Sequence, residues 1–212
     1  MKKLALLMLL LPVAAFAQGV RYTAANELRG SGRIVQETTQ MAPFAELHIS
    51  QFPATVIVEA GAAESSVTVS IDDNLRSLLQ LRHGPGKLYL SFRGEPDGQW
   101  VNNATIRVLV KTTHLTGLRH ESNSDVLVRG VAGALFNLTN EANGNATLVG
   151  LVDTLNVVSR ANGLIDASEL PARVANIVTA ANATLRINAQ SVHELNSAHA
   201  NITNQVKRPR PH

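Results

Sequence analysis

The sequence of 212 residues contains no cysteine, and only 4% of its residues are aromatic. The lack of cysteine excludes a disulfide-stapled scaffold, a thiolate metal site and a cysteine nucleophile. Because 45% of the residues are hydrophobic and few are aromatic, the core must consist of aliphatic side chains. The formal net charge is only +3, which argues against the basic surface that nucleic-acid binding requires. We therefore expect no nucleic-acid partner.

Long hydrophobic runs are also missing, but the N-terminus carries a short one. Two lysines precede an apolar stretch over residues 4–13, and Ala15 and Ala17 offer the small side chains that a signal peptidase reads. The stretch is too short to span a bilayer, which needs roughly 20 apolar residues, so we expect no transmembrane segment. The pattern predicts a signal peptide over residues 1–17, with cleavage before Gln18.

The expected location follows from export together with the absence of cysteine. Small secreted domains of animals commonly rely on disulfides, whereas this chain has none. We therefore expect the mature protein in the periplasm, at the cell surface or in the medium of a Gram-negative bacterium.

Behind the leader, the chain divides by composition. Residues 18–32 are polar, end in a Gly-Ser-Gly segment and are expected to be flexible. Residues 33–111 contain several stretches that alternate apolar and polar side chains, which predicts β-strands. We expect residues 33–206 to form a single domain. Residues 207–212 form a basic, proline-punctuated tail that cannot continue a strand.

Over residues 112–206 a short motif recurs at a nearly constant interval. It consists of an asparagine flanked by small residues, and a somewhat shorter interval leads to a final, degraded copy: Asn123, Asn143, Asn162, Asn182 and the region of His199. A second marker with about the same interval consists of leucines, with an alanine in one slot: Leu115, Leu135, Leu155, Ala175 and Leu195. Two markers with one period predict a structural repeat of about 20 residues.

A period near 20 with high β-propensity predicts a solenoid of strands. One turn cannot bury its own apolar face, but parallel strands of successive turns can pair about 4.8 Å apart. The predicted fold is therefore all-β, with a mixed-strand N-terminal portion over residues 33–111 and parallel rungs over residues 112–206. In this register, Leu135 and Leu155 are both expected to point into the core.

The asparagine column, Asn123, Asn143, Asn162 and Asn182, allows two interpretations. Asparagine tolerates a left-handed backbone, and stacked amides can hydrogen-bond along a coil, so the column suits tight corners. The functional alternative is an asparagine face that binds sugar hydroxyls. We favour the structural interpretation.

Acidic residues are candidates for catalysis, because β-helical enzymes commonly act on acidic polysaccharides. Glycoside hydrolysis needs two carboxylates about 5–9 Å apart on one face. The repeat aligns Asp125 and Asp166 with uncharged positions, so acids do not stack in columns. Asp72 and Asp73 precede a leucine-rich turn and are expected to cap it. We predict no catalytic residues.

Seven histidines are present, but no two have the i, i+4 spacing of a helical metal site. His114 and His120 repeat the six-residue separation of His193 and His199, but several turns lie between the two pairs. We therefore predict no metal site and no cofactor.

The layout of the chain resembles a bacterial envelope family, the "putative auto-transporter adhesin, head GIN domain". The segments that carry the resemblance are Gly30-Ser31-Gly32, Phe44 with Leu47 and Ile49, Leu75 to Leu81, Gly86 to Leu90, Glu121 to Val126 and Arg160 to Ala167. The resemblance covers residues 31–204 and implies a right-handed parallel β-helix. The motif aspartate of the family is present only at Asp125.

The function that we expect is that of an exported, non-enzymatic envelope protein, adhesin-like or a structural scaffold. Its expected partner is an envelope polysaccharide or another envelope protein. The alternative is a polysaccharide-active β-helix enzyme, a lyase or hydrolase, which would need carboxylates with raised pKa in a groove. The sequence does not indicate an oligomeric state.

Overall fold

The structure is a computed structural model that describes residues 27–93, 100–102, 104–196 and 200–206. The regular elements are strands and one 3-10 helix: β1 (Glu27–Arg29), β2 (Ile34–Gln40), β3 (Glu46–Ser50), β4 (Val56–Ala60), β5 (Ser66–Asp72), η2 (Asp73–Leu78), β6 (Leu79–Gly84), β7 (Lys87–Phe92), β8 (Trp100–Asn102), β9 (Ile106–Thr112), β10 (Gly117–Glu121), β11 (Val126–Asn140), β12 (Ala146–Ser159), β13 (Leu164–Thr179), β14 (Thr184–Asn196) and β15 (Asn201–Asn204). The predicted signal peptide, residues 18–26 of the predicted flexible segment and the whole predicted tail, residues 207–212, lie outside the described residues.

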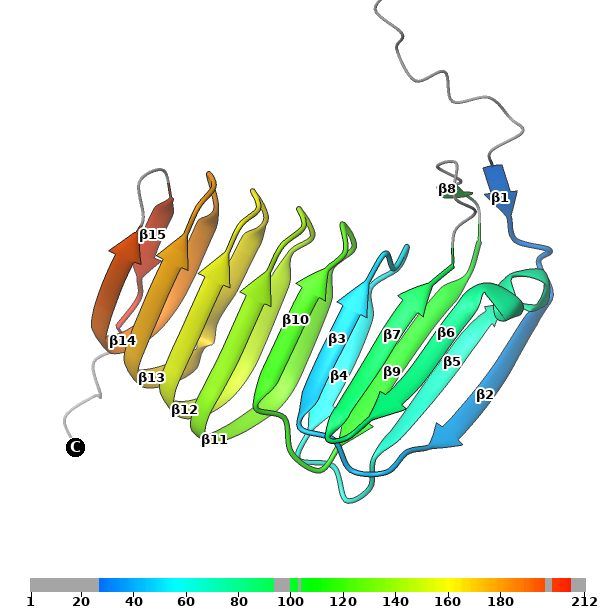
Figure 1. The fold of residues 1–212 in the computed structure, drawn as a ribbon, viewed down its shortest axis with the longest axis horizontal. Helices are drawn as coiled ribbons and strands as arrows, with labels where there is room; N and C mark the ends of the chain where they lie inside the picture. Colours follow the sequence, from blue (N-terminus) through cyan, green and yellow to red (C-terminus); the bar gives the residue numbers. More distant parts are fainter. Residues whose placement is uncertain (1–26, 94–99, 103, 197–199, 207–212) are drawn as a thin grey trace, which may run out of the picture.

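Thirteen of the strands form one mixed sheet, and β1 pairs with β8 in a separate two-stranded sheet. The large sheet curls over itself, so that it has two layers with the core between them (Figure 1). One layer has the order β6-β7-β3-β10, and the other contains β2, β5, β9 and β4. Both layers continue into the long strands β11 to β14, which are shared between them.

The long strands cross from one layer to the other at a bend. In β11, Val126 to Arg129 pair with β4 in one layer, whereas Gly117 to His120 of β10 pair with the other end of β11. Gly130 and Gly150 lie at bends with positive φ, of 74° and 155°. A Cβ on Gly150 would lie 2.0 Å from the carbonyl oxygen of Val131, so only glycine fits this close approach.

The parallel register of the long strands follows the spacing of the asparagine motif. Val126 pairs with Ala146, Ala146 with Ile165, Ile165 with Leu185 and Leu185 with Ile202. Each of these offsets equals the interval between the corresponding copies of the motif, including the shorter interval at the end. The repeat in the sequence is therefore the repeat of strand pairing.

The expectation of an all-β chain with a mixed-strand N-terminal portion is confirmed. The sheet is mixed because β5 is antiparallel to both β2 and β9, and β6 is antiparallel to β7. Its observed form is one curled, open sheet, a half-barrel. The predicted right-handed parallel β-helix is a more specific arrangement of these strands, and it stays a prediction. Pairing of β3 with β10 and of β4 with β11 makes the sheet continuous across residue 112.

The core is aliphatic apart from three buried phenylalanines on the inner face and one more at Phe136. The prediction that Leu135 points into the core is wrong, because Leu135 is 39% exposed. Its neighbour Phe136 is fully buried instead and pairs with Leu155. The cause is a bulge in β11 between Val128 and Val131, after which the offset to β12 is shorter by one. A one-residue slip moves a side chain to the opposite face of a sheet. Leu195, the last leucine of the marker, is 71% exposed as well.

The prediction that Asp72 and Asp73 cap the leucine-rich turn is also wrong in its mechanism. Asp72 occupies the N-cap position of η2 but makes no side-chain capping hydrogen bond. Its buried carboxylate instead accepts the backbone N–H groups of Gly32 and Thr105, both at 2.6 Å. Asp73 accepts hydrogen bonds from Ser31 and Arg33. The acidic pair therefore fastens the segment before β2 to the sheet.

Candidate functional site

The four asparagines of the predicted column lie at successive corners of the long strands. Asn123 Oδ1 accepts the backbone N–H of Asn143 at 3.1 Å, Asn143 Oδ1 that of Asn162 at 3.1 Å, and Asn162 Oδ1 that of Asn182 at 3.2 Å. The bonds thus run from side chain to backbone. None of the four residues has a positive φ, so the left-handed tolerance of asparagine is not used at these corners.

Close packing of the corners depends on small residues beside the asparagines. A Cβ on Gly144 would lie 2.0 Å from the carbonyl oxygen of Ser124, and one on Gly163 would lie 2.4 Å from that of Gly144. Real Cβ atoms do not approach a backbone oxygen so closely, so any side chain at either glycine would force the corners apart.

A buried polar group lies directly beneath these corners. His120 is fully buried, and its Nδ1 lies 2.9 Å from Asn140 Oδ1. Its Nε2 has no hydrogen-bond partner in the described part of the chain. Burial lowers the pKa of His120, although the contact with Asn140 opposes this shift. His120 is therefore a neutral core histidine.

A second asparagine ladder, which the sequence analysis missed, crosses the outer face of the sheet. Asn156 Nδ2 donates to Asn137 Oδ1 at 2.9 Å, and Asn176 Nδ2 donates to Asn156 Oδ1 at 2.8 Å. The three residues are paired in register on β11, β12 and β13. Their spacing follows the same period as the corner asparagines, so it is visible in the sequence and could have been found as a third marker.

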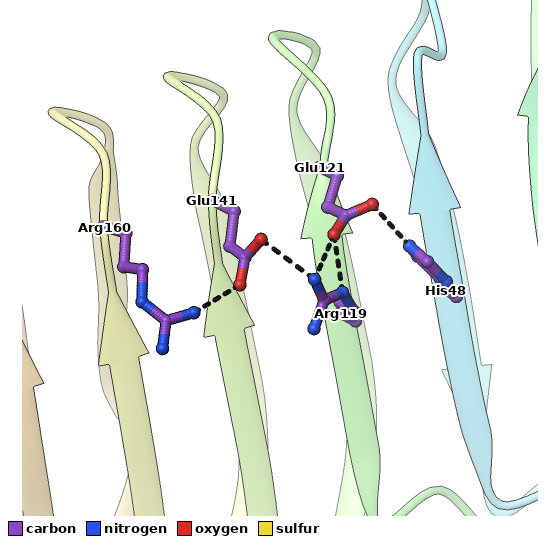
Figure 2. A network of polar contacts seen from close by, with 5 residues as sticks. All are labelled: His48, Arg119, Glu121, Glu141 and Arg160. Atoms are coloured by element: carbon purple, nitrogen blue, oxygen red, sulfur yellow. Dashed lines mark hydrogen bonds and ion pairs between the residues drawn. The ribbon is translucent and has the colours of Figure 1, made fainter.

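Next to this ladder, five charged or ionisable side chains form a continuous network across β3, β10 and the ends of β11 and β12 (Figure 2). Its central residue is Arg119, whose guanidinium contacts Glu121 at 2.5 Å and Glu141 at 2.9 Å. Glu121 also contacts His48 Nε2 at 2.7 Å, and Glu141 contacts Arg160 at 2.6 Å. The two carboxylates thus alternate with three basic side chains, those of His48, Arg119 and Arg160.

The contacts within the network favour the charged forms of Glu121 and Arg119. The hydrogen bond from His48, helped by Arg119, holds the pKa of Glu121 below its usual value. The same Glu121 contact raises the pKa of Arg119. Glu121 is therefore an ionised hydrogen-bond acceptor at neutral pH and not a general acid.

Between the network and the asparagine ladder lies a hollow of about 320 Å³ on the outer face of β7, β3, β10 and β11. Gly117 forms part of its floor, because it pairs with Glu46 on one side and Asn137 on the other and has no side chain of its own. Arg119 and His48, which also line the hollow, form the pair two residues further along the same strands. No pattern in the sequence distinguished this glycine from the others.

The acidic residues considered for catalysis are engaged in separate contacts. Asp125 Oδ1 accepts both the backbone N–H and the side-chain Nδ2 of Asn145. Burial opposes ionisation of Asp166, but hydrogen bonds from Ser168 and Arg186 hold its pKa below the usual value. Neither residue lines the hollow over Gly117.

Within residues 27–93, 100–102, 104–196 and 200–206, no group of three histidine, aspartate or glutamate side chains could hold a metal ion. The same residues contain no helix with the length and apolar character needed to cross a membrane.

The fold and the outer face define an all-β protein with a polar, internally ion-paired sheet surface. The chain belongs to the family described as "Putative auto-transporter adhesin, head GIN domain", whose profile matches residues 43–204. The resemblance found in the sequence is thereby confirmed. No protein with a curated description matches the chain.

Two solved structures that are similar to this chain cover most of its length. A "putative adhesin" from Bacteroides fragilis NCTC 9343 is 13% identical, with a TM-score of 0.66, over 84% of this chain and 100% of that chain. A "putative adhesin" from Parabacteroides merdae ATCC 43184 is 14% identical, with a TM-score of 0.44, over 85% of this chain and 98% of that one. The first of these supports the fold, and at such identities neither bears on the ligand.

Proposed function

We propose that this protein is an exported, non-enzymatic envelope protein that binds its partner through the outer face of β7, β3, β10 and β11. The observation that carries this proposal is the network around Arg119, which links β3, β10 and the ends of β11 and β12 through hydrogen-bonded charges. Membership of an adhesin-like family supports a binding or structural role and a location outside the cytoplasm. The partner is an envelope polysaccharide or another envelope protein.

The arrangement suits binding because the face is rigid before any partner arrives. Its strands are held on both sides by neighbouring strands, and Arg119 is fixed by two carboxylates. Groups that are already ordered lose little conformational entropy on binding. Exposed networks of this kind also fix orientation and specificity more than they add affinity.

The alternative, a polysaccharide-active lyase or hydrolase, has less support. Such an enzyme needs a carboxyl group whose pKa is raised so that it can act as an acid. Glu121 and Asp166 both have lowered pKa values, and their contacts with Arg119 and Arg186 account for part of this. We therefore favour binding without turnover.

Several finer features belong to the same proposal. Residues 1–17 are a signal peptide, residues 33–206 are one domain, and the long strands coil as successive turns of a right-handed parallel β-helix. The asparagine column at Asn123, Asn143, Asn162 and Asn182 is structural, because each Oδ1 of the first three is engaged by the next corner.

Export and binding can be tested together in the native host. Mass spectrometry of the protein from the envelope fraction should find Gln18 as the first residue, and an intact Met1 in that fraction would contradict export. Purified mature protein should sediment with isolated envelopes and leave the polysaccharide chain length unchanged. Arg119→Ala should weaken this association, whereas Arg76→Ala, which removes an ion pair with Glu37 elsewhere on the sheet, should not. Failure to sediment with envelopes would overturn the proposed function.

A further inference from the structure

We infer that the hollow over Gly117 binds a neutral sugar unit of an envelope polysaccharide. The inference rests on the proposed function and names the ligand class of the same face. A volume of about 320 Å³ lies at the lower end of the range for small-molecule sites, roughly 300–1,000 Å³. The hollow is therefore large enough for a small polar ligand and too small for a folded partner.

The hollow exists because one side chain is missing from an otherwise continuous row. Across the strands the row reads Lys87, Glu46, Gly117, Asn137 and Asn156. The side chains on either side of the glycine form its walls. A Cβ on Gly117 would lie 3.3 Å from the flexible side chain of Glu46 and 3.8 Å from the carbonyl oxygen of Asn137. A side chain could thus be added here with only a small adjustment of its neighbours.

The charges around the hollow favour a neutral occupant. Lys87 is paired with Glu46 at 2.6 Å, and Arg119 is paired with Glu121 and Glu141. An anionic ligand would have to displace a carboxylate from each cation, and a cationic ligand would face the same competition. A hydroxyl group both donates and accepts hydrogen bonds, so it can use the remaining capacity of these groups without separating the ion pairs.

The asparagine ladder supplies a directed donor at the edge of the hollow. Each amide in the ladder donates to the asparagine on the preceding strand, from Asn176 to Asn156 and from Asn156 to Asn137. The Nδ2 of Asn137 ends this chain and donates to no other group in the described part of the protein. Hydrogen bonds in a chain polarise one another, which strengthens this terminal donor. Tyr89, which also lines the hollow, adds apolar area of the kind that sugar rings contact.

The test uses the full mature protein and a variant in which the hollow is filled. Gly117→Val introduces a β-branched residue that suits a strand, and Thr154→Val, on β12 outside the hollow, is the matched control. Equal thermal transitions should show that both variants fold. Binding is measured by calorimetry with neutral, uronic-acid-containing and amino-sugar-rich fractions of the envelope polysaccharide, each prepared separately.

We expect wild type and Thr154→Val to bind the neutral fraction and Gly117→Val to lose at least tenfold in affinity. Amide chemical shifts of Gly117, Arg119 and Asn137 should move on titration of the wild type. Preference for a charged fraction, or unchanged affinity in Gly117→Val, would overturn the inference while leaving envelope binding intact. If the wild type did not bind whole envelopes, that result would instead contradict the proposed function. If Gly117→Val does not fold, Gly117→Ser serves as the filled variant.

Discussion

Replacing Phe136 and its neighbour Leu135 in turn tests the register of the long strands. Phe136 is fully buried and is the largest such side chain in the described part of the protein, whereas Leu135 is 39% exposed. Truncating a buried phenylalanine to alanine costs about 3–5 kcal/mol, because both the transfer free energy and a cavity contribute. Leu135 opens no cavity on truncation, so Leu135→Ala should cost about 1 kcal/mol.

Thermal and urea unfolding followed by circular dichroism can measure this difference. For a domain of this size, each 1 kcal/mol lowers Tm by about 2–4 °C. Phe136→Ala should therefore lower Tm by about 6–20 °C and Leu135→Ala by about 2–4 °C. Unchanged m-values would show that both variants unfold from the same native state.

The reasoning fails if Leu135→Ala costs as much as Phe136→Ala, because that would place Leu135 in the core and remove the bulge between Val128 and Val131. If Phe136→Ala does not fold, Phe136→Leu provides the comparison, with an expected loss of about 1–2 kcal/mol. Leu155→Ala should cost about 2–5 kcal/mol in either register.

Three further predictions concern the buried histidine, the corners and the sheet edge. Burial lowers the pKa of His120 in the folded state, so the unfolded chain binds the proton more readily. The contribution of His120 to the free energy of unfolding is therefore fully present above pH ~6.5 and is lost as the pH falls below that value. Urea titrations at several pH values should show this loss in the wild type and a flatter profile in His120→Gln. Gly144→Ala should lose about 1–3 kcal/mol through its clash with backbone oxygens, whereas Gly84→Ala, which meets only a tyrosine ring at 3.4 Å, should change stability little in the same assay. Asn204 pairs its amide with both backbone groups of Ala189, at 2.8 and 3.0 Å, so Asn204→Ala should expose this edge and raise self-association in light scattering; an unchanged mass across protein concentrations would show that the amide does not protect the edge.

The sequence predicted the features that depend on a constant period. The step between asparagine motifs equals the pairing offset of the long strands, because residues one period apart pair on neighbouring strands. Leu135 was misplaced because β11 contains one extra residue, at a bulge, relative to β12. Periodicity alone cannot detect such an insertion.

The contacts that join distant segments could not be predicted from local pattern. Asp72 looked like a helix cap, but its partners Gly32 and Thr105 are 40 and 33 residues away in the chain. The hollow over Gly117 likewise depends on β3, β7 and β11 lying around one glycine. A single glycine in a strand does not reveal what its neighbours will be.

The energetics of the network around Arg119 bear on what it is for. Its side chains are between 21% and 59% exposed, and exposed ion pairs contribute about 0–1 kcal/mol each and are weakened by salt. The network therefore adds little to a fold whose stability derives from its aliphatic core. What the contacts do achieve is to hold one guanidinium in a fixed orientation beside the hollow over Gly117. Replacing a binding group that does not stabilise the fold should lower the affinity for the partner and leave Tm nearly unchanged, which is the outcome that we expect for Arg119→Ala.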